Sequence, residues 1–99
     1  MAAYVVVNLT VNDPATFEQY RAVVVPLILN SGGKYLAVDF EPMDLDGTSL
    51  PGLAIVEFES VEAVQRFYNS PEYQAVIGLR LSSTDGWLRV VPEFTMPTS

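Results

Sequence analysis

Apolar and polar residues alternate along four segments of the chain, the pattern of β-strands with one buried face. The segments are 4–11, 34–41, 53–59 and 87–94. In the first, alternate residues separate into two sets, Val5, Val7, Leu9 and Val11 against Tyr4, Val6, Asn8 and Thr10. In the second, Leu36, Val38 and Phe40 are expected to share a face. A polar loop with Pro and Gly, residues 42–52, joins the second and third strands as a hairpin-type connection.

A helix is predicted between the first two strands. Asp13 suits the N-cap and Pro14 the first helical position. Apolar residues then recur at spacings of three and four, which marks a buried stripe, at Phe17, Tyr20, Val24 and Ile28. Pro26 interrupts this pattern and predicts a kink or an early break. The segment "NSGG", 30–33, ends the helix.

The stretch after the third strand predicts a helix broken in two. Ser60 caps a short helix, and Ser70-Pro71-Glu72 starts another with a cap, an N1 proline and an acid near the positive helix end. One face of this second helix carries Tyr73, Val76, Ile77 and Arg80. The segment "TDG", 84–86, is read as a turn before the last strand.

The resulting order, β-α-β-β-α-α-β, is the split βαβ pattern of the ferredoxin-like fold. We therefore expect an α+β protein whose helices cover one face of a four-stranded antiparallel sheet with strand order 4-1-3-2. With 99 residues and no linker, the chain is expected to form a single domain, 1–99.

The second sheet face is too apolar to be left in water. It carries residues of mixed character, Tyr4, Val6, Asn8, Ile55, Glu57, Trp87, Arg89 and Val91. Such a patch usually marks association. We expect a Glu57–Arg89 ion pair that bridges over Asn8 inside a homodimer interface. The alternative is a solvated cross-strand pair worth less than about 1 kcal/mol.

Composition excludes several classes of function. Twelve acidic against five basic residues give a net charge of −7, which disfavours nucleic acid and anionic membranes as partners. The chain has no cysteine and no histidine, so thiol chemistry, a Ser-His-Asp triad and a histidine-ligated haem or zinc are excluded. No nucleotide motif and no signal peptide occurs. We expect a cytoplasmic protein with no cofactor and no metal.

Arg80 is the candidate for chemistry, because it lies on the apolar stripe of a helix. A buried arginine needs an anionic partner. The partner is either a ligand carboxylate or enolate, or a protein group such as Asp13 or a helix-end carbonyl. Tyr20 shares the stripe of the first helix and is expected to line a pocket. Asn30 is either an oxyanion donor or only a helix cap.

The segments "YVVVNLTVNDPATFEQYR", "SGGKYL", "IVEF" and "FYNSPEYQAVIGLR" resemble the domain-of-unknown-function family 1330, in the dimeric α/β-barrel superfamily. The resemblance covers about residues 3–92. The positions that match the family's recurrent residues are Asp13, Tyr20, Gly32, Gly33, Lys34, Glu57, Tyr73 and Arg80. Two positions depart from the family pattern: Asn30-Ser31 replaces a frequent histidine, and Phe17 a frequent tyrosine.

The resemblance implies a homodimer with facing sheets and a small pocket between sheet and helices in each subunit. Superfamily members include cofactor-independent monooxygenases, polyketide-type cyclases, isomerases and haem enzymes. We expect a small-molecule-binding homodimer that acts as a cofactor-independent enzyme on a carbonyl-bearing or phenolic substrate, polyketide-like or aromatic, such as a monooxygenase, cyclase or isomerase. The alternative is a non-catalytic ligand-binding or structural module. The expected catalytic residues are Arg80, Tyr20 and Asn30, the substrate-binding residues Tyr73, Phe17, Tyr35 and Phe67, and the interface residues Asn8, Glu57, Trp87 and Arg89.

Overall fold

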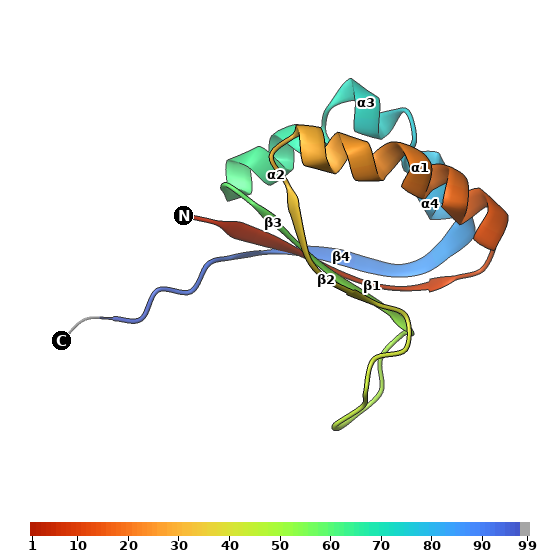
Figure 1. The fold of residues 1–99 in the computed structure, drawn as a ribbon, viewed down its shortest axis with the longest axis horizontal. Coiled ribbons are helices and arrows are strands. Elements are labelled where there is room, and N and C mark those ends of the chain that lie inside the picture. Colours follow the sequence, from red (N-terminus) through yellow and green to blue (C-terminus); the bar gives the residue numbers. More distant parts are fainter. Residues whose placement is uncertain (98–99) are drawn as a thin grey trace.

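The computed structural model describes residues 1–97, which form one antiparallel sheet with helices on one face (Figure 1). Its elements are β1 Ala3–Val11, α1 Pro14–Asn30, β2 Lys34–Asp39, β3 Gly52–Phe58, α2 Val61–Tyr68, α3 Pro71–Gln74, α4 Ile77–Ser83 and β4 Thr84–Pro92. The strand order is β2-β3-β1-β4, which is the expected order read from the other edge. The predicted ferredoxin-like α+β fold is thus confirmed. No helix within residues 1–97 is long and apolar enough to cross a membrane.

The sheet register confirms which residues of the central strands face the helices. Val5 lies opposite Val56 on one side and Val90 on the other. The next residue on the same face, Val7, lies opposite Ala54 and Leu88. Strands of a helix-covered sheet bury one face in this way. The edge strand β4 is covered less well.

The prediction for β2 was wrong at Leu36, because the strand contains a bulge, whereas Val38 pairs with Ala54 on the helix-covered face. Tyr35 pairs with Val56, but Ala37 pairs with Ile55, so the alternation shifts by one residue between them. A bulge reverses which side chains face the core. Tyr35 therefore joins the helix-covered face, whereas Leu36 remains 46% exposed.

Helix α1 begins where the sequence predicts but does not break at Pro26. The Asp13 carboxylate accepts hydrogen bonds from the backbone N–H and the hydroxyl of Thr16. The helix then continues to Asn30 with Pro26 on its exposed side. Val24 and Ile28, before and after the proline, are both buried. Packing on this stripe holds the helix together across Pro26, so the expected break is absent.

The second helical region has two breaks rather than one. Ser60 and Ser70 cap α2 and α3 through their hydroxyls, as predicted. However, α3 ends at Gln74, and α4 starts only after Val76. Val76 has φ −115° and ψ −3°, outside the helical range, and its N–H bonds to the carbonyl of Tyr73. Tyr73 and Arg80 therefore belong to different helices.

The expected cross-strand pair of Glu57 and Arg89 is also absent. Glu57 lies opposite Tyr4 and Arg89 opposite Val6, so the two charges are offset along β1. The Arg89 guanidinium instead donates to the Leu88 carbonyl and lies 5.4 Å from the centre of the Trp87 ring. The ion pair within residues 1–97 joins Arg21 and Glu18.

The side chain of Asn8 is hydrogen-bonded to the β2–β3 connection of the same subunit. Its amide nitrogen donates to the carbonyls of Leu50 and Gly52, and its oxygen accepts from the Leu50 N–H. Asn8 is 4% exposed and anchors the β2–β3 loop against β1. The predicted bridge over Asn8 is therefore wrong, because the residue is already covered and satisfied.

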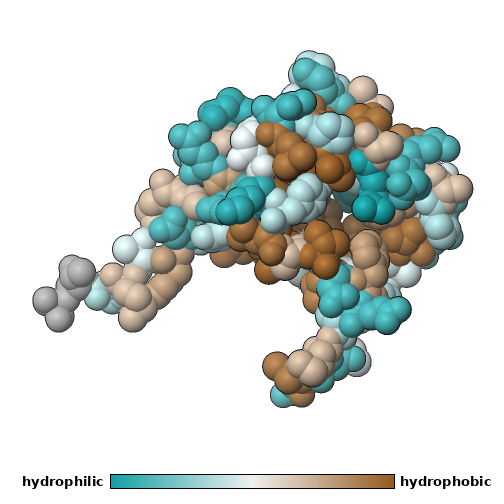
Figure 2. All heavy atoms as spheres, in the orientation of Figure 1, coloured by the Kyte–Doolittle hydropathy of each residue, from teal (hydrophilic) through white to brown (hydrophobic). Residues whose placement is uncertain are grey.

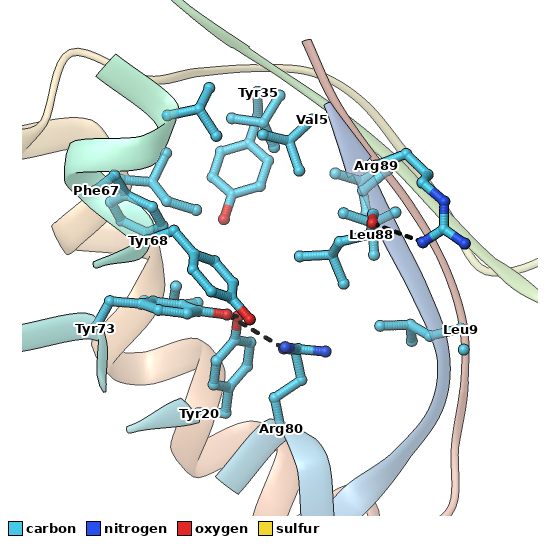
Figure 3. Close-up of a pocket in the computed structure, with 18 of the residues that line it drawn as sticks. Val5, Leu9, Tyr20, Tyr35, Phe67, Tyr68, Tyr73, Arg80, Leu88 and Arg89 are labelled. Carbon is cyan, nitrogen blue, oxygen red and sulfur yellow. Dashed lines mark hydrogen bonds between the residues drawn. The ribbon is translucent and has the colours of Figure 1, made fainter. Parts of the chain in front are cut away.

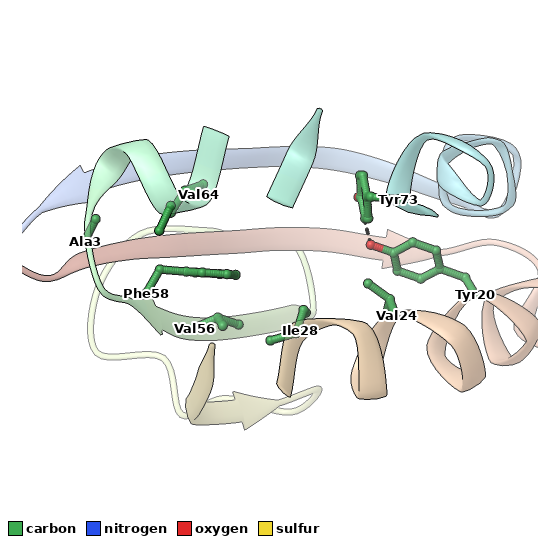
Figure 4. Close-up of a cluster of buried hydrophobic side chains, with 9 residues drawn as sticks. Ala3, Tyr20, Val24, Ile28, Val56, Phe58, Val64 and Tyr73 are labelled. Atoms are coloured by element: carbon green, nitrogen blue, oxygen red, sulfur yellow. Dashed lines mark hydrogen bonds between the residues drawn. The ribbon is translucent and has the colours of Figure 1, made fainter. Parts of the chain in front are cut away.

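The buried core joins the two layers at one part of the sheet (Figure 4). Its members come from the helices and from two strands, namely Tyr20, Val24, Ile28, Ala63, Val64, Tyr73, Ala3, Val56 and Phe58. Tyr73 is the largest fully buried side chain, at 1% exposure. Several other inward-facing residues are only half-buried, among them Val5, Phe17 and Tyr35. The two layers are therefore not packed together along their whole length.

The predicted turn at 84–86 is instead the start of β4. Thr84, Asp85 and Gly86 pair with Val11, Thr10 and Leu9. Gly86 has φ +147°, and a Cβ placed there would lie 2.2 Å from the Asn8 carbonyl oxygen. The glycine is thus required by the close approach of β4 to β1 rather than by a turn.

Gly86→Ala should destabilise the protein by about 1–3 kcal/mol or more, through backbone strain and the clash with β1. Gly78→Ala is the matched control, because a Cβ at this helical glycine meets nothing within 4 Å. It should be neutral or stabilising by up to about 1 kcal/mol. Urea unfolding of both variants checks the expectation, and equal effects would contradict it.

Candidate functional site

A cavity of about 680 Å³ lies between the sheet and the helices. Figure 2 shows its opening as an apolar hollow between the two layers. Its floor is the helix-facing side of the sheet, with Val5, Val7, Leu9 and Leu88. Its walls are largely aromatic, with Phe17, Tyr20, Tyr35, Phe67, Tyr68 and Tyr73. A volume of this size suits a small organic ligand.

Arg80 is the buried charge of this cavity. It comes from α4, is 9% exposed and points into the hollow (Figure 3). Its Nε donates to the Tyr73 hydroxyl at 3.2 Å. The Arg80 carbonyl accepts from the hydroxyls of Thr84 and Ser83, which fixes the end of α4. The backbone that carries the arginine is therefore held firmly.

The charge of Arg80 is not neutralised by a carboxylate within residues 1–97. Asp13, the protein partner considered from the sequence, is exposed and bound to Thr16. Arg80 makes its side-chain hydrogen bond to a neutral phenol and uses only Nε. Its two Nη groups have no hydrogen-bond acceptor among the described side chains. A buried guanidinium in this situation attracts an anion, which it can bind in a bidentate manner.

Tyr73 and Tyr20 extend the polar group around Arg80. Their hydroxyl oxygens are 2.9 Å apart, and the rings meet edge to face at 6.2 Å. Each phenol has one proton to donate. The Tyr73–Tyr20 bond uses one of these protons, and Arg80 donates its own. One hydroxyl proton is therefore left to point at a ligand oxygen.

Burial sets the protonation of these groups. Desolvation, followed by the neighbouring Tyr73, raises the pKa of Tyr20 far above its ordinary value. Desolvation also raises the pKa of Tyr35. For Arg80, burial acts to lower the pKa, but the contributions of Tyr73, Tyr20 and Tyr68 outweigh it and the pKa rises. Tyr20 is thus a neutral hydrogen-bond donor, and Arg80 a permanent cation.

An aromatic cluster holds Tyr73 in place. Its ring centre lies 4.9 Å from that of Phe67 and 5.3 Å from that of Tyr68. Phe67 also contacts Phe58 of β3, at 5.4 Å. These tilted contacts are favourable geometries for aromatic rings. They join α2 and α3 to the sheet and leave the Tyr73 hydroxyl aimed at Arg80.

The structure brings together most of the residues that the sequence selected. Arg80 and Tyr20 lie within one hydrogen-bonded group through Tyr73. The four expected substrate-binding residues, Tyr73, Phe17, Tyr35 and Phe67, all line the cavity. Asn30 does not join them. It is the exposed last residue of α1 and lies outside the lining, so no geometry supports an oxyanion role.

Four polar lining residues were not selected from the sequence, namely Tyr68, Arg21, Gln65 and Asn69. The ring centre of Tyr68 lies 5.3 Å from that of Tyr73, and its phenol is among the groups that raise the pKa of Arg80. Arg21 lies at the cavity with its side chain 52% exposed. A signal for Arg21 was present, because it follows Phe17 by four residues and so shares its side of α1. No group of acidic residues within 1–97 is arranged to hold a metal ion.

The face of the sheet opposite the helices carries the other selected residues. Trp87 and Ile55 are each 38% exposed there, and Val91 is 47% exposed. Trp87 and Arg89 also contribute to the lining of the cavity, but Figure 3 shows the Arg89 guanidinium directed away from Arg80, across β4. The surface around Trp87 and Ile55 is thus partly apolar and exposed.

The fold and the arrangement of this sheet under its helices define a ferredoxin-like α+β protein. The model of a family described as a domain of unknown function, DUF1330, matches residues 2–94, so the chain belongs to this family. A comparison with curated proteins finds no match.

Solved structures share this fold at low sequence identity. The protein of unknown function RPA0582 from Rhodopseudomonas palustris is 16% identical, with a TM-score of 0.81 over 96% of this chain and 84% of that chain. SnoaB, a cofactor-independent oxygenase from Streptomyces nogalater, is 16% identical, with a TM-score of 0.66 over 99% and 95%. A dimeric ferredoxin-like protein of unknown function from Thermobifida fusca is 12% identical, with a TM-score of 0.62 over 94% and 92%.

The raised pKa of Tyr20 predicts a loss of stability in alkali. The unfolded chain releases this proton near the ordinary tyrosine value of 10.0, whereas the folded protein retains it. The contribution is therefore complete below pH 10 and declines as the pH rises above it. Tyr20 should account for a fall of up to about 1.4 kcal/mol per pH unit in the free energy of unfolding.

Tyr20→Phe should remove this fall, because phenylalanine has no proton to release. Urea unfolding of both proteins on either side of pH 10 measures it. The other tyrosines are present in both proteins, so the difference between the two curves isolates Tyr20. Curves that stay parallel above pH 10 would contradict the assignment.

Proposed function

We propose that this protein is an enzyme that binds an aromatic phenol or enolisable ketone in the cavity and acts on it without a cofactor. The observation that carries the proposal is Arg80, a buried cation at the wall of an apolar cavity whose only side-chain partner among residues 1–97 is a phenol. A core arginine that served stability alone is expected to have a carboxylate or helix-end carbonyls as its partners.

Arg80 and the tyrosine pair suit the stabilisation of a developing oxyanion. The guanidinium offers its Nη groups to a phenolate or enolate oxygen, and the remaining hydroxyl proton of the Tyr20–Tyr73 pair offers a second hydrogen bond. Both donors sit in a site of low polarity, where such interactions are stronger than in water. Binding at this end lowers the pKa of the substrate hydroxyl and favours its ionised form.

Within residues 1–97 the cavity lining contains no carboxylate, and the raised pKa of Tyr20 keeps its phenol protonated, so it does not serve as a base. The proton of the substrate is therefore transferred to water, and the protein acts by stabilising the anion that remains. An electron-rich enolate of this kind can react directly with O₂. A methylene between two aryl rings plus one O₂ then gives a carbonyl and one water.

The oxygenase activity of SnoaB, which shares the fold, makes this the first reaction class to test. Anthrone is a suitable probe, because its enol is a phenol and its oxidation by one O₂ gives anthraquinone and one water. The protein should accelerate O₂ uptake and anthraquinone formation in equal amounts. Arg80→Met should lower the rate about 10²-fold to 10³-fold, as the loss of one oxyanion donor does.

Arg66→Met is the matched control, since Arg66 is exposed on α2 and does not line the cavity. It should leave the rate unchanged. Conversion of a supplied enol ether or enone to a product under nitrogen as well as in air would indicate an isomerase or cyclase instead. Binding of anthrone, seen as a thermal shift, with no turnover in air or nitrogen would leave a non-catalytic binding module. Absence of both binding and turnover would reject the proposal.

The proposed working form is a cytoplasmic homodimer. In it the two sheets meet through the faces opposite their helices, called the bare faces. Trp87, Ile55 and Val91 leave an apolar area exposed on that face. Proteins with this fold from Thermobifida fusca and Bacteroides fragilis are described as dimeric. Glu57 and Arg89 border the same surface and would supply polar contacts across it. The acidic net charge makes nucleic acid and anionic membranes unsuitable partners.

Trp87→Glu should convert the dimer to a monomer, because it places a carboxylate in the middle of the apolar contact. Light scattering after size exclusion measures the mass. Leu81→Glu is the control, since Leu81 is 61% exposed on α4, away from the bare sheet face. It should remain dimeric. A monomeric unaltered protein, or a dimer that tolerates Trp87→Glu, would contradict the proposed interface.

A further inference from the structure

The cavity has a second polar end, formed by Tyr35 and Arg21. Tyr35 comes from β2, and Figure 3 shows its hydroxyl projecting into the hollow from the side opposite Arg80. The hydroxyl has no hydrogen-bond partner within residues 1–97. Tyr35 faces inward only because of the bulge in β2, which turns it onto the helix-covered face. The bulge therefore places a polar tip in an otherwise apolar wall.

Arg21 gives this end of the cavity a positive charge. It lines the cavity with its side chain 52% exposed, which places it at the opening. It is close enough to Tyr35 for its charge to oppose, in part, the effect of burial on the Tyr35 pKa. Its exposed ion pair with Glu18, at 3.2 Å, is a surface contact of little strength. Arg21 can therefore turn to a ligand at small cost.

Gln65 and Asn69 add polar groups to the lining from α2 and its C-cap, but the surfaces of the sheet and α1 between the two ends offer almost no polar contact. They are formed by aliphatic residues of the sheet and α1, among them Val5, Val24, Ile28 and Val56. A ligand that spans the cavity must therefore be apolar in its middle. Its ends face donors on both sides, because Arg80, Arg21 and the neutral Tyr35 hydroxyl all donate hydrogen bonds.

We infer that the ligand is an elongated aromatic compound with acceptor oxygens at both ends, an anionic oxygen bound by Arg80 and a carbonyl or carboxylate oxygen bound by Tyr35 and Arg21. The inference rests on the proposed function, because it assumes that the cavity is the ligand site. The inference also specifies how the ligand is oriented in the cavity. The oxyanion lies at the inner end, and the second oxygen lies at the opening.

Aromatic acids of two lengths, benzoic and biphenyl carboxylic acids, test both ends. Each acid carries at its distal para position either an acetyl group or an isopropenyl group, which has the same shape but no acceptor oxygen. Each acid is also compared with its carboxamide. Calorimetry then measures the affinity of the unaltered protein and of three variants, Arg80→Met, Tyr35→Phe and Arg66→Met.

In either the benzoic or the biphenyl series, the acid should bind at least about tenfold more tightly than its carboxamide, as expected for a charge-assisted hydrogen bond. This preference should disappear in Arg80→Met and persist in Arg66→Met. The acetyl compound should bind about three- to tenfold more tightly than the isopropenyl compound. That advantage should disappear in Tyr35→Phe and persist in Arg80→Met.

Several results would overturn the inference. One is the absence of an acetyl advantage at both lengths, and another is an acetyl advantage that depends on Arg80 instead of Tyr35. Equal binding of acid and carboxamide in the unaltered protein would also reject it, and this comparison needs no variant. These outcomes differ from a failure of the proposed function. If anthrone is not turned over but the acids show both dependences, only the reaction is wrong; if anthrone is turned over and the acid preference depends on Arg80, but no acetyl advantage depends on Tyr35, only the second end is wrong.

Discussion

The site depends on one constraint, a guanidinium buried among phenols. Arg80 donates to Tyr73, and Tyr73 shares a hydrogen bond with Tyr20, so the group links α4, α3 and α1. Because no carboxylate within residues 1–97 neutralises Arg80, the charge remains available to the cavity. Phenols can hold an arginine in position without cancelling its charge, which a carboxylate cannot do. The same contacts thus order the helices and keep the anion site open.

The cavity exists because the sheet and the helices are not packed together along their whole length. A small chain buries a limited fraction of its surface, and here the buried core joins helices and sheet at only one part of their contact. The inward residues beyond it, such as Val5 and Phe17, are half-buried and form lining instead of core. The space for a ligand therefore means less packing between the helices and the sheet. Burial of the bare sheet face in a dimer would offset part of this loss.

Most of the local structure follows from short-range signals in the sequence. Asp13 and Pro14, Ser60, and Ser70 with Pro71 each start a helix at the expected residue, because capping depends on neighbours only a few positions away. The alternation in β1 and β3 correctly predicts the helix-covered face. The breaks were less predictable. Pro26 was overridden by packing of Val24 and Ile28, and no local signal marked the stop after Gln74.

The sequence by itself determined the fold class and the inward position of Tyr20, because periodicity on one element indicates which side of it is buried. Arg80 also faces inward as expected, although a break separates its helix from that of Tyr73. Only the tertiary structure decided which groups meet. Tyr73 became the partner of Arg80 through contacts between separate helices. Tyr35 turned inward through the bulge between β2 and β3, and Glu57 and Arg89 were separated by the register of two different strand pairs. Register and helix packing join residues far apart in the chain, and periodicity within one element carries no information about them.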